Sequence, residues 1–593
     1  DSIRQRGITT VAEALRGVPG VHVGRINTGQ WAVSIRGFSG RYTNKLLVLV
    51  DGRSVYVPSF SGVYWDELDT LLDDIDRIEV IRGPGGTLWG PNAVNGIVNI
   101  ITRNAAETPD TLLVAGSGNQ QPMVGNIRSG FALGSNTAGR VFAKVSEHDG
   151  FRNQLDQQDS NEQWDQTRLG FRLDSEPNQR DSLTLQGDTY RLDGQQQEGI
   201  LGLDVSLGDY RASGSNLLGR WSRTLSDNQS YSLQAYFDHV SRRESFLQQR
   251  HDTIDLDFQH RVPLSETQDL LWGINYRRVS DRLYNGTQLL LTPERNTASH
   301  YGLFVQNEIT LGASTRVILG SKFDQNAFTG FEYQPNLRVV WQPNDRHTVW
   351  ASIARAVRTP SRIEQDARIT LPQPVNALFG NPDIESENLA SIEFGYRFSA
   401  DNGFSLDVTA YKNEYRDIIG SELRFPPTQP PLLDIVFNNN LTSESHGVEA
   451  ALSWQPSPRW RLNGNYTLVK LGVDLQNPND AGLVFEGLQL RTPEHQFTLD
   501  SDWTISDNWF FHLRTQYVDG VPPSQSLTAA SSEKTESYVG VDASLSWRHS
   551  DRLELLLSAK NLLGTRLEFL GETLTPGSEI DRMGYLQLRF SWD

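Results

Sequence analysis

Closely spaced glycines are the first residues here that could carry chemistry, because a glycine-rich loop after a strand can cradle a phosphate. Two segments with strand patterns, residues 75–82 and 97–102, flank them. The glycines are Gly83, Gly85, Gly86, Gly90 and Gly96. A G-x-G-x-x-G pattern begins at Gly83, but Leu88 stands where the last glycine belongs, and no G-x-x-x-x-G-K-S/T motif exists. The spacing therefore argues against a nucleotide site and favours a tight turn.

The sequence contains little that would indicate a catalytic or metal-binding site. Ser443, Glu444 and His446 are the residue types of a hydrolase triad, but neighbouring side chains in one strand point in alternating directions. The chain has no H-E-x-x-H and no G-x-S-x-G. Asp73 and Asp74 could bind Ca²⁺, yet no D-x-D-x-D-G loop is present, and the chain has no Cys and only two Met. We expect no catalytic residue, no metal site and no cofactor.

Composition excludes several classes of protein. The net charge of the 593-residue chain is −18, which argues against a nucleic-acid binder. It contains no apolar run of about 18 residues, the length that a membrane-spanning helix needs. A search for apolar runs does not detect transmembrane barrels, because only every second residue of their strands faces lipid. No signal-peptide pattern is present, so we expect residue 1 to begin a processed or trimmed chain.

From about residue 110 onward, segments of about ten residues alternate between apolar and polar side chains, with turn residues between them. In TIDLDFQHRV, for example, Ile254, Leu256 and Phe258 share one face. A soluble sandwich has the same period, but this stretch is long for a sandwich, and a closed barrel leaves no exposed edge. Short turns alternate with longer polar stretches such as 192–215 and 424–443, which predicts short turns at one end of a barrel and long loops at the other.

The glycine-rich stretch also carries a family resemblance. DRIEVIRGP, LWG and NGIVNIIT resemble the closing signature of the plug domain of TonB-dependent outer-membrane receptors. SIRG and LLVLVDG match earlier plug motifs, while FGNPDIESENLASIEFGYRF and SHGVEAALSW resemble motifs of the family's barrel. The resemblance implies a mostly β protein, with a plug over residues 1–105 inside an antiparallel transmembrane β-barrel of 22 strands over residues 106–593. Residues 8–23 are then expected to contain the first plug helix, and residues 66–80 a short acidic helix that leads into the glycine-rich stretch.

The resemblance also implies a function. Such a protein is a monomer of the bacterial outer membrane, in contact with lipid and lipopolysaccharide, which binds a scarce external ligand and makes no bond. It would admit the ligand when TonB and its inner-membrane complex pull on the plug, although the family's TonB box is not recognisable in this sequence. A ferric siderophore is the expected cargo, with cobalamin or an oligosaccharide as the alternative. A passive porin and an outer-membrane lipase are more distant alternatives.

Aromatic and basic residues at the plug apices are the candidates for ligand binding. Aromatic faces and a cation suit a planar, anionic iron chelate. The set comprises Arg41, Tyr42, Tyr56, Tyr64 and Trp65 from the plug, with Arg362, Arg368 and Phe379 from the barrel loops.

Four further residues form a predicted cluster that holds the plug to the barrel wall. In SIEFGYRF, Ile392 and Phe394 must face lipid, which turns Glu393 inward, and the same alternation turns Glu449 inward in HGVEAALSW. In the resembling family, arginines of the IRG and RGP motifs pair with these glutamates. We therefore predict that Arg82 lies within salt-bridge distance of Glu393, and that Arg36 lies near Glu449 or shares the same pair.

Overall fold

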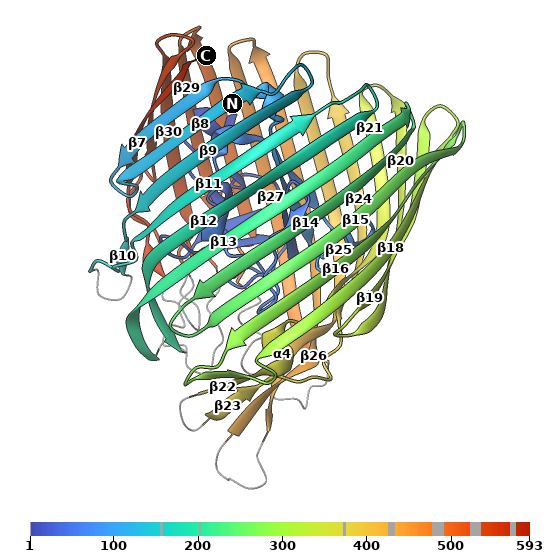
Figure 1. The fold of residues 1–593 in the computed structure, drawn as a ribbon, viewed down its shortest axis with the longest axis vertical. Coiled ribbons are helices and arrows are strands. Elements are labelled where there is room, and N and C mark those ends of the chain that lie inside the picture. Colours follow the sequence, from blue (N-terminus) through green and yellow to red (C-terminus); the bar gives the residue numbers. More distant parts are fainter. Residues whose placement is uncertain are drawn as a thin grey trace.

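The computed structural model describes residues 2–153, 158–200, 203–371, 375–424, 433–476, 491–521, 535–569 and 577–592. Within these residues, the closed sheet contains twenty-five strand segments, and without the three short segments β17, β22 and β23 it has twenty-two. Figure 1 shows these strands as a tilted ring around the N-terminal part of the chain. A 22-stranded barrel that encloses an N-terminal plug is therefore confirmed. No helix among the described residues is long and apolar enough to cross a membrane.

The barrel strands follow one another in chain order, and the last strand pairs with the first to close the sheet. They are β7 (Thr111–Gly118), β8 (Met123–Ala132), β9 (Thr137–His148), β11 (Trp164–Ser175), β12 (Asp181–Ile200), β13 (Leu203–Ser226), β14 (Gln229–Arg243), β15 (Gln248–Ser265), β16 (Gln268–Tyr284), β18 (Arg295–Leu311), β19 (Thr315–Asn326), β20 (Gly330–Asn344), β21 (His347–Arg358), β24 (Glu387–Ser399), β25 (Phe404–Arg424), β26 (Leu433–Ser457), β27 (Trp460–Leu475), β28 (His495–Ser506), β29 (Trp509–Val518), β30 (Tyr538–Arg548), β31 (Leu553–Lys560) and β33 (Met583–Trp592).

The two ends of the barrel differ. Both chain termini lie at the end with short turns, and the opposite end carries the small elements of the long loops (Figure 1). Those elements are β10 (Arg152–Asn153), β17 (Leu289–Leu291), α4 (Arg362–Asp366), β22 (Ala367–Thr370), β23 (Val375–Phe379) and β32 (Ser578–Glu579). Along each strand, exposed apolar side chains alternate with buried polar ones, as for Ile254 at 48% exposed and Asp255 at 2%. This pattern places an apolar surface outside and a polar lumen inside.

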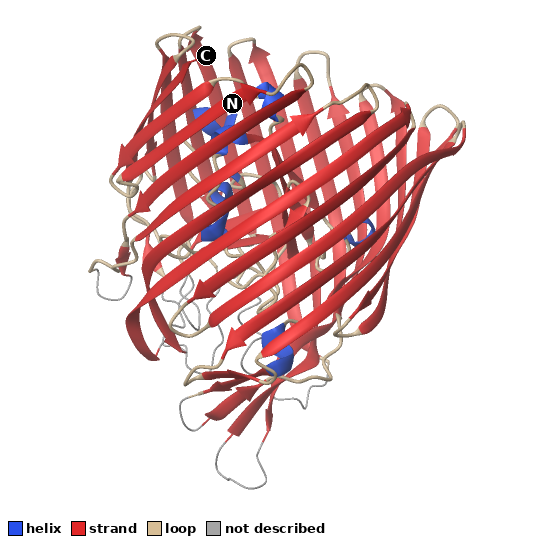
Figure 2. Cartoon of the chain, viewed as in Figure 1, coloured by secondary structure: helices blue, strands red, loops and turns tan. Residues whose placement is uncertain are grey.

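The plug combines small sheets with very short helices, which Figure 2 shows inside the ring. Its strands β3, β4, β5 and β6 form one sheet in the order β4-β3-β6-β5, and β1 pairs with β2. The elements are α1 (Ser2–Gln5), α2 (Val11–Ala14), β1 (Val21–Arg25), β2 (Trp31–Ile35), β3 (Leu46–Val50), β4 (Arg53–Ser54), the 3₁₀ turns η1 (Trp65–Leu68) and η2 (Leu72–Asp74), β5 (Ile75–Arg82), α3 (Gly86–Trp89), β6 (Gly96–Thr102) and η3 (Ala105–Glu107).

The glycine-rich stretch forms the predicted turn between two strands, β5 and β6, which pair antiparallel. Within the turn, α3 is a single helical turn bounded by Gly83 and Gly90. Both glycines have a left-handed backbone, with φ of +85° and +83°, which a side chain at these positions would disfavour. The stretch thus builds a small projecting helix and no phosphate cradle.

Three expectations about local structure need correction. The helix expected in residues 8–23 is α2, which is only four residues long and follows α1, and the acidic segment 66–80 forms 3₁₀ turns and most of β5 instead of one helix. Residues 192–215 and 424–443 are not simply loops, because β12, β13 and β26 extend through much of them. Paired strands satisfy each other's backbone groups even without apolar side chains, so these hairpins continue beyond the apolar band. Residues 425–432 lie outside the described ranges.

Candidate functional site

The predicted plug-to-wall cluster is assembled around Arg36. Its guanidinium forms an ion pair with Glu393 on β24, and its Nε lies 2.7 Å from Oε1 of Glu449 on β26. Its planar face covers the Tyr411 ring of β25, 4.1 Å from the ring centre. Arg36 is 1% exposed, Glu393 3% and Glu449 0%, so water does not separate these charges. Burial alone would lower the pKa of Arg36, but the carboxylates of Glu449 and Glu393 raise it above its ordinary value.

Arg82 joins the same cluster through a different partner than predicted. Its Nη1 lies 3.0 Å from Oε2 of Glu449, and its Nη2 lies 3.6 Å from Asp407. The predicted direct pair between Arg82 and Glu393 is therefore wrong. The register of β25 explains this result, because Asp407, Thr409 and Tyr411 follow one another on its inner face. Glu449 stands opposite Thr409 and Glu393 opposite Tyr411, one inward position farther from Asp407.

Three of the proposed ligand residues meet at one plug apex. Tyr42 contacts Phe60 edge to face at 5.0 Å between ring centres, and Phe60 contacts Tyr64 in the same way at 5.0 Å. The Arg41 guanidinium lies 5.0 Å from the Tyr42 ring centre and pairs with Glu244 at 2.9 Å. Tyr64 is buried, whereas Tyr42 remains half-buried. This apex therefore presents an aromatic face next to a guanidinium.

A barrel arginine that the sequence prediction omitted completes this apex. Arg242 of β14 stacks on Tyr64 at 3.9 Å and pairs with Asp66, Glu67 and Glu244. The alternation of β14 predicts that Arg242 points inward, but no sequence pattern indicates that it contacts the plug.

The remaining candidates lie elsewhere. Trp65 packs against the plug's hydrophobic core, and Tyr56 packs against the residues behind β3 and β6, so neither joins the apex cluster. Arg362 is fully buried and pairs with Asp281 and Asp366, which gives it a structural setting in α4. Arg368 is exposed and lies 5.6 Å from the ring centre of Phe379, on the neighbouring segments β22 and β23. These two residues therefore lie together within the long loops.

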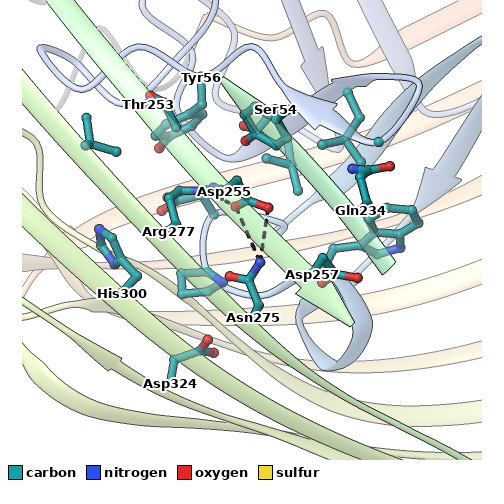
Figure 3. A pocket seen from close by; sticks show the side chains of 18 of the residues that line it. Ser54, Tyr56, Gln234, Thr253, Asp255, Asp257, Asn275, Arg277, His300 and Asp324 are labelled. Carbon is teal, nitrogen blue, oxygen red and sulfur yellow. Dashed lines mark hydrogen bonds and ion pairs between the residues drawn. The ribbon is translucent and has the colours of Figure 1, made fainter. Parts of the chain in front are cut away.

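A cavity of about 530 Å³ lies between the plug and one side of the barrel. Figure 3 shows its wall, where Asp255, Asn275 and Arg277 form a bonded group near Asp257 and Asp324. The plug side includes residues from β3, β6 and the turn around α3, such as Leu47, Asn99 and Trp89. Within the described residues, no group of three or more acidic or histidine side chains could hold a metal ion.

A plug fastened inside a closed barrel with an apolar outer surface defines a plugged membrane barrel. The family model of the TonB-dependent receptor plug domain matches residues 1–97, and that of the TonB-dependent receptor-like β-barrel matches residues 110–562. The chain therefore belongs to the TonB-dependent receptor family, whose members reside in the outer membrane. The boundary between residues 105 and 106 that we assigned stays a prediction.

Individual relatives are distant. The iron-regulated outer membrane virulence protein of Vibrio cholerae is 23% identical over 96% of this chain and 88% of its own length. The vitamin B12 transporter BtuB of Vibrio vulnificus is 24% identical over 70% of this chain and 66% of its own. The crystal structure of the siderophore receptor PirA from Acinetobacter baumannii superposes with a TM-score of 0.80 at 15% identity, covering 100% of this chain and 97% of that one.

Proposed function

We propose that this receptor imports a ferric siderophore across the outer membrane and that TonB, with its inner-membrane complex, drives the import. The observation that carries the proposal is the chemistry of the plug apex, where the half-buried Tyr42 stands beside the Arg41 guanidinium and the rings of Phe60 and Tyr64. Aromatic rings and cations together suit an anionic iron chelate with planar ligand groups. Arg368 and Phe379 supply the same pair of chemical types from the loops above.

The relatives support iron as the first cargo to test. The names of the Vibrio cholerae and Acinetobacter baumannii proteins refer to iron regulation and to a siderophore. Cobalamin is the second candidate, because a vitamin B12 transporter is a relative of comparable identity. An oligosaccharide remains the third.

Neither catalysis nor passive diffusion suits this chain as well. The family consists of receptors and transporters, and we propose that this protein makes and breaks no bond. A passive porin requires an open lumen, whereas here buried ion pairs such as Arg36–Glu449 fasten a plug inside the barrel.

Growth of a receptor-deficient bacterial host tests the proposal. Expression of the protein should allow iron-limited growth on ferric siderophores supplied one at a time, and deletion of the host's TonB should abolish that growth. Cobalamin-limited growth of the same strain on cobalamin is the parallel assay. Growth on cobalamin with no growth on any iron chelate would show that cobalamin, and not a ferric siderophore, is the cargo. Growth on iron chelates without TonB would refute TonB-driven import.

A further inference from the structure

The plug is fastened unevenly around the barrel. On one side, Asp74 pairs with Arg128 of β8 and Asp69 pairs with Lys144 of β9. Farther around, the cluster of Arg36 and Arg82 holds the plug to β24, β25 and β26. On a third side, Arg6 pairs with Asp500 and Asp502 of β28. Nearby, Arg16 pairs with Glu568, and Glu13 pairs with Lys560 of β31.

Four consecutive strands lack such ties along most of their length. Within the described residues, which include all of β15, β16, β18 and β19, the only hydrogen bond from these strands to the plug joins Gln249 to the Tyr64 hydroxyl at 2.9 Å. Gln249 lies at the long-loop end of β15. Below that contact, no hydrogen bond or ion pair joins these strands to the plug among the described residues, and Thr87 of α3 lies close to Gly320 of β19.

The 530 Å³ cavity lies against these four strands and against the neighbouring β13 and β14, which contribute Arg220, Gln234 and Tyr236. Its barrel lining includes Thr253, Asp257, Val279, His300 and Lys322, which come from β15, β16, β18 and β19. Toward the long loops it is bordered by the plug residues Tyr56, Pro58 and Ser61 and by Thr359 and Pro360 of the barrel. Toward the short turns it extends to Arg77, Ile101 and Gln259. The cavity therefore runs lengthwise between the plug and the untied wall.

Its surface suits a polar solute. Carboxylates of Asp255, Asp257 and Asp324 line it together with the cation of Arg277 (Figure 3), and Lys322 adds a second cation to the lining. Tyr236 also lines it and is 4% exposed, and its hydroxyl has no hydrogen-bond partner among the described residues. A buried hydroxyl without a partner costs free energy, which a passing hydrogen-bonding solute would offset.

The helix α3 forms one border of this space. Leu88 and Trp89 line the cavity, and a single side-chain hydrogen bond, from Thr87 Oγ1 to the carbonyl of Gln334 at 3.0 Å, ties α3 to the barrel. The segment that follows α3 is held more firmly, since Asn92 donates to the Val357 carbonyl and accepts from the Thr359 amide at the end of β21. Gly83 and Gly90 bound the helix and give it backbone freedom.

We propose that cargo crosses the barrel along the wall of β15, β16, β18 and β19, through this cavity, when α3 is displaced. The cavity is then a second holding place for a polar, charged cargo beneath the plug apex. The inference rests on the proposed transport function, but it concerns the route and not the identity of the cargo.

Single cysteines test the route, because the chain has no cysteine of its own. The reporter is Thr253→Cys, in the cavity, and its matched control is Thr498→Cys on β28. Both threonines face the lumen and are 8% exposed. Thr498, however, lines a gap of only about 30 Å³ beside tied plug residues. The probe is a membrane-impermeant fluorescein maleimide added to intact cells, with and without TonB, in iron-starved medium supplied with ferric siderophores.

We expect TonB to increase the labelling rate of Thr253→Cys several-fold and to leave that of Thr498→Cys unchanged. Ser232→Cys of β14, which lines the same cavity, should repeat the result if Thr253→Cys does not reach the membrane. TonB-dependent labelling of Thr498→Cys alone, or of neither wall, would overturn the route. TonB-dependent labelling of Thr253→Cys in a strain that grows on no iron chelate would refute the proposed cargo and leave the route intact.

Discussion

Replacing Glu449 by Gln should loosen the plug in the barrel. The Glu449 carboxylate is fully buried and accepts hydrogen bonds from Arg36 at 2.7 and 3.3 Å, and Arg82 lies 3.0 Å away. Glutamine keeps the shape and one acceptor oxygen but removes the charge, so Arg36 keeps only Glu393 and Arg82 keeps only Asp407 as a charged partner. Removal of one partner from a buried ion pair costs about 3–5 kcal/mol, and the retained amide oxygen together with the partial exposure of Arg82 favours the lower figure.

Urea-induced opening measures this loss. With a denaturant slope of about 2 kcal/mol per molar for a unit of plug size, a loss of about 3 kcal/mol lowers the urea midpoint by about 1.5 M. The onset of ion conductance in planar bilayers reports plug release, and heat-modifiable migration in gels shows that the barrel itself stays folded.

A control on the same strand separates this effect from a general loss of charge. Glu444 of β26 is exposed and pairs with Lys412 at 3.0 Å on the outer face. Surface pairs contribute about 0–1 kcal/mol, so Glu444→Gln should lower the midpoint by less than about 0.5 M. An unchanged midpoint for Glu449→Gln, or equal shifts for both variants, would refute the reasoning.

Three further predictions address the gate, the loops and the apex. In Gly86→Cys with Gln334→Cys, a Cβ at Gly86 would lie 3.4 Å from that of Gln334, close to disulfide geometry. Oxidation should therefore stop TonB-dependent growth on the cargo and a reductant should restore it, whereas growth of the oxidised variant would contradict a moving α3. Burial raises the pKa of Glu162, in the loop before β11, from 4.5 to about 7. Its contribution to stability is thus full below pH 4.5 and lost as pH rises through 7, and protease cleavage of this loop should increase from pH 5 to 8 in the native protein but not in Glu162→Gln. Tyr42→Ala should weaken cargo binding by about tenfold, the equivalent of about 1.4 kcal/mol, without moving the urea midpoint; equal affinity would place the site elsewhere.

Alternation and turn residues favoured a closed barrel, and the family resemblance supplied its 22 strands. Which face of each strand meets lipid follows from local pattern alone, as the inward Glu393 and the 62% exposed Ile392 demonstrate. The strand–turn–strand around the glycines was predictable for the same reason. The length of the long hairpins was not, because polar strands beyond the apolar band have the composition of loops.

Specific pairings depend on information that no local pattern holds. Whether Arg82 meets Glu393 or Glu449 is decided by the register between β24, β25 and β26, which places the two carboxylates at successive inward positions. Trp65 illustrates the same limit within the plug, since an aromatic residue in an apical segment can turn either outward to ligand or inward to the core. The alternation of β14 predicted that Arg242 points inward, but its contact with Tyr64 depends on the folded barrel.

The uneven fastening of the plug also determines which motion costs least. Withdrawal of the whole plug breaks several buried ion pairs, and each lost partner costs about 3–5 kcal/mol if its charge stays buried. Displacement of α3 breaks one neutral hydrogen bond, from Thr87 to Gln334, with a net contribution of about 0.5–1.5 kcal/mol. Its apolar contacts with β18 and β19 add to this cost but leave no unpaired charge. A pulling force on the plug therefore meets the least resistance where the cavity already lies, and the ion pairs around the other strands keep the rest of the plug in register with the barrel.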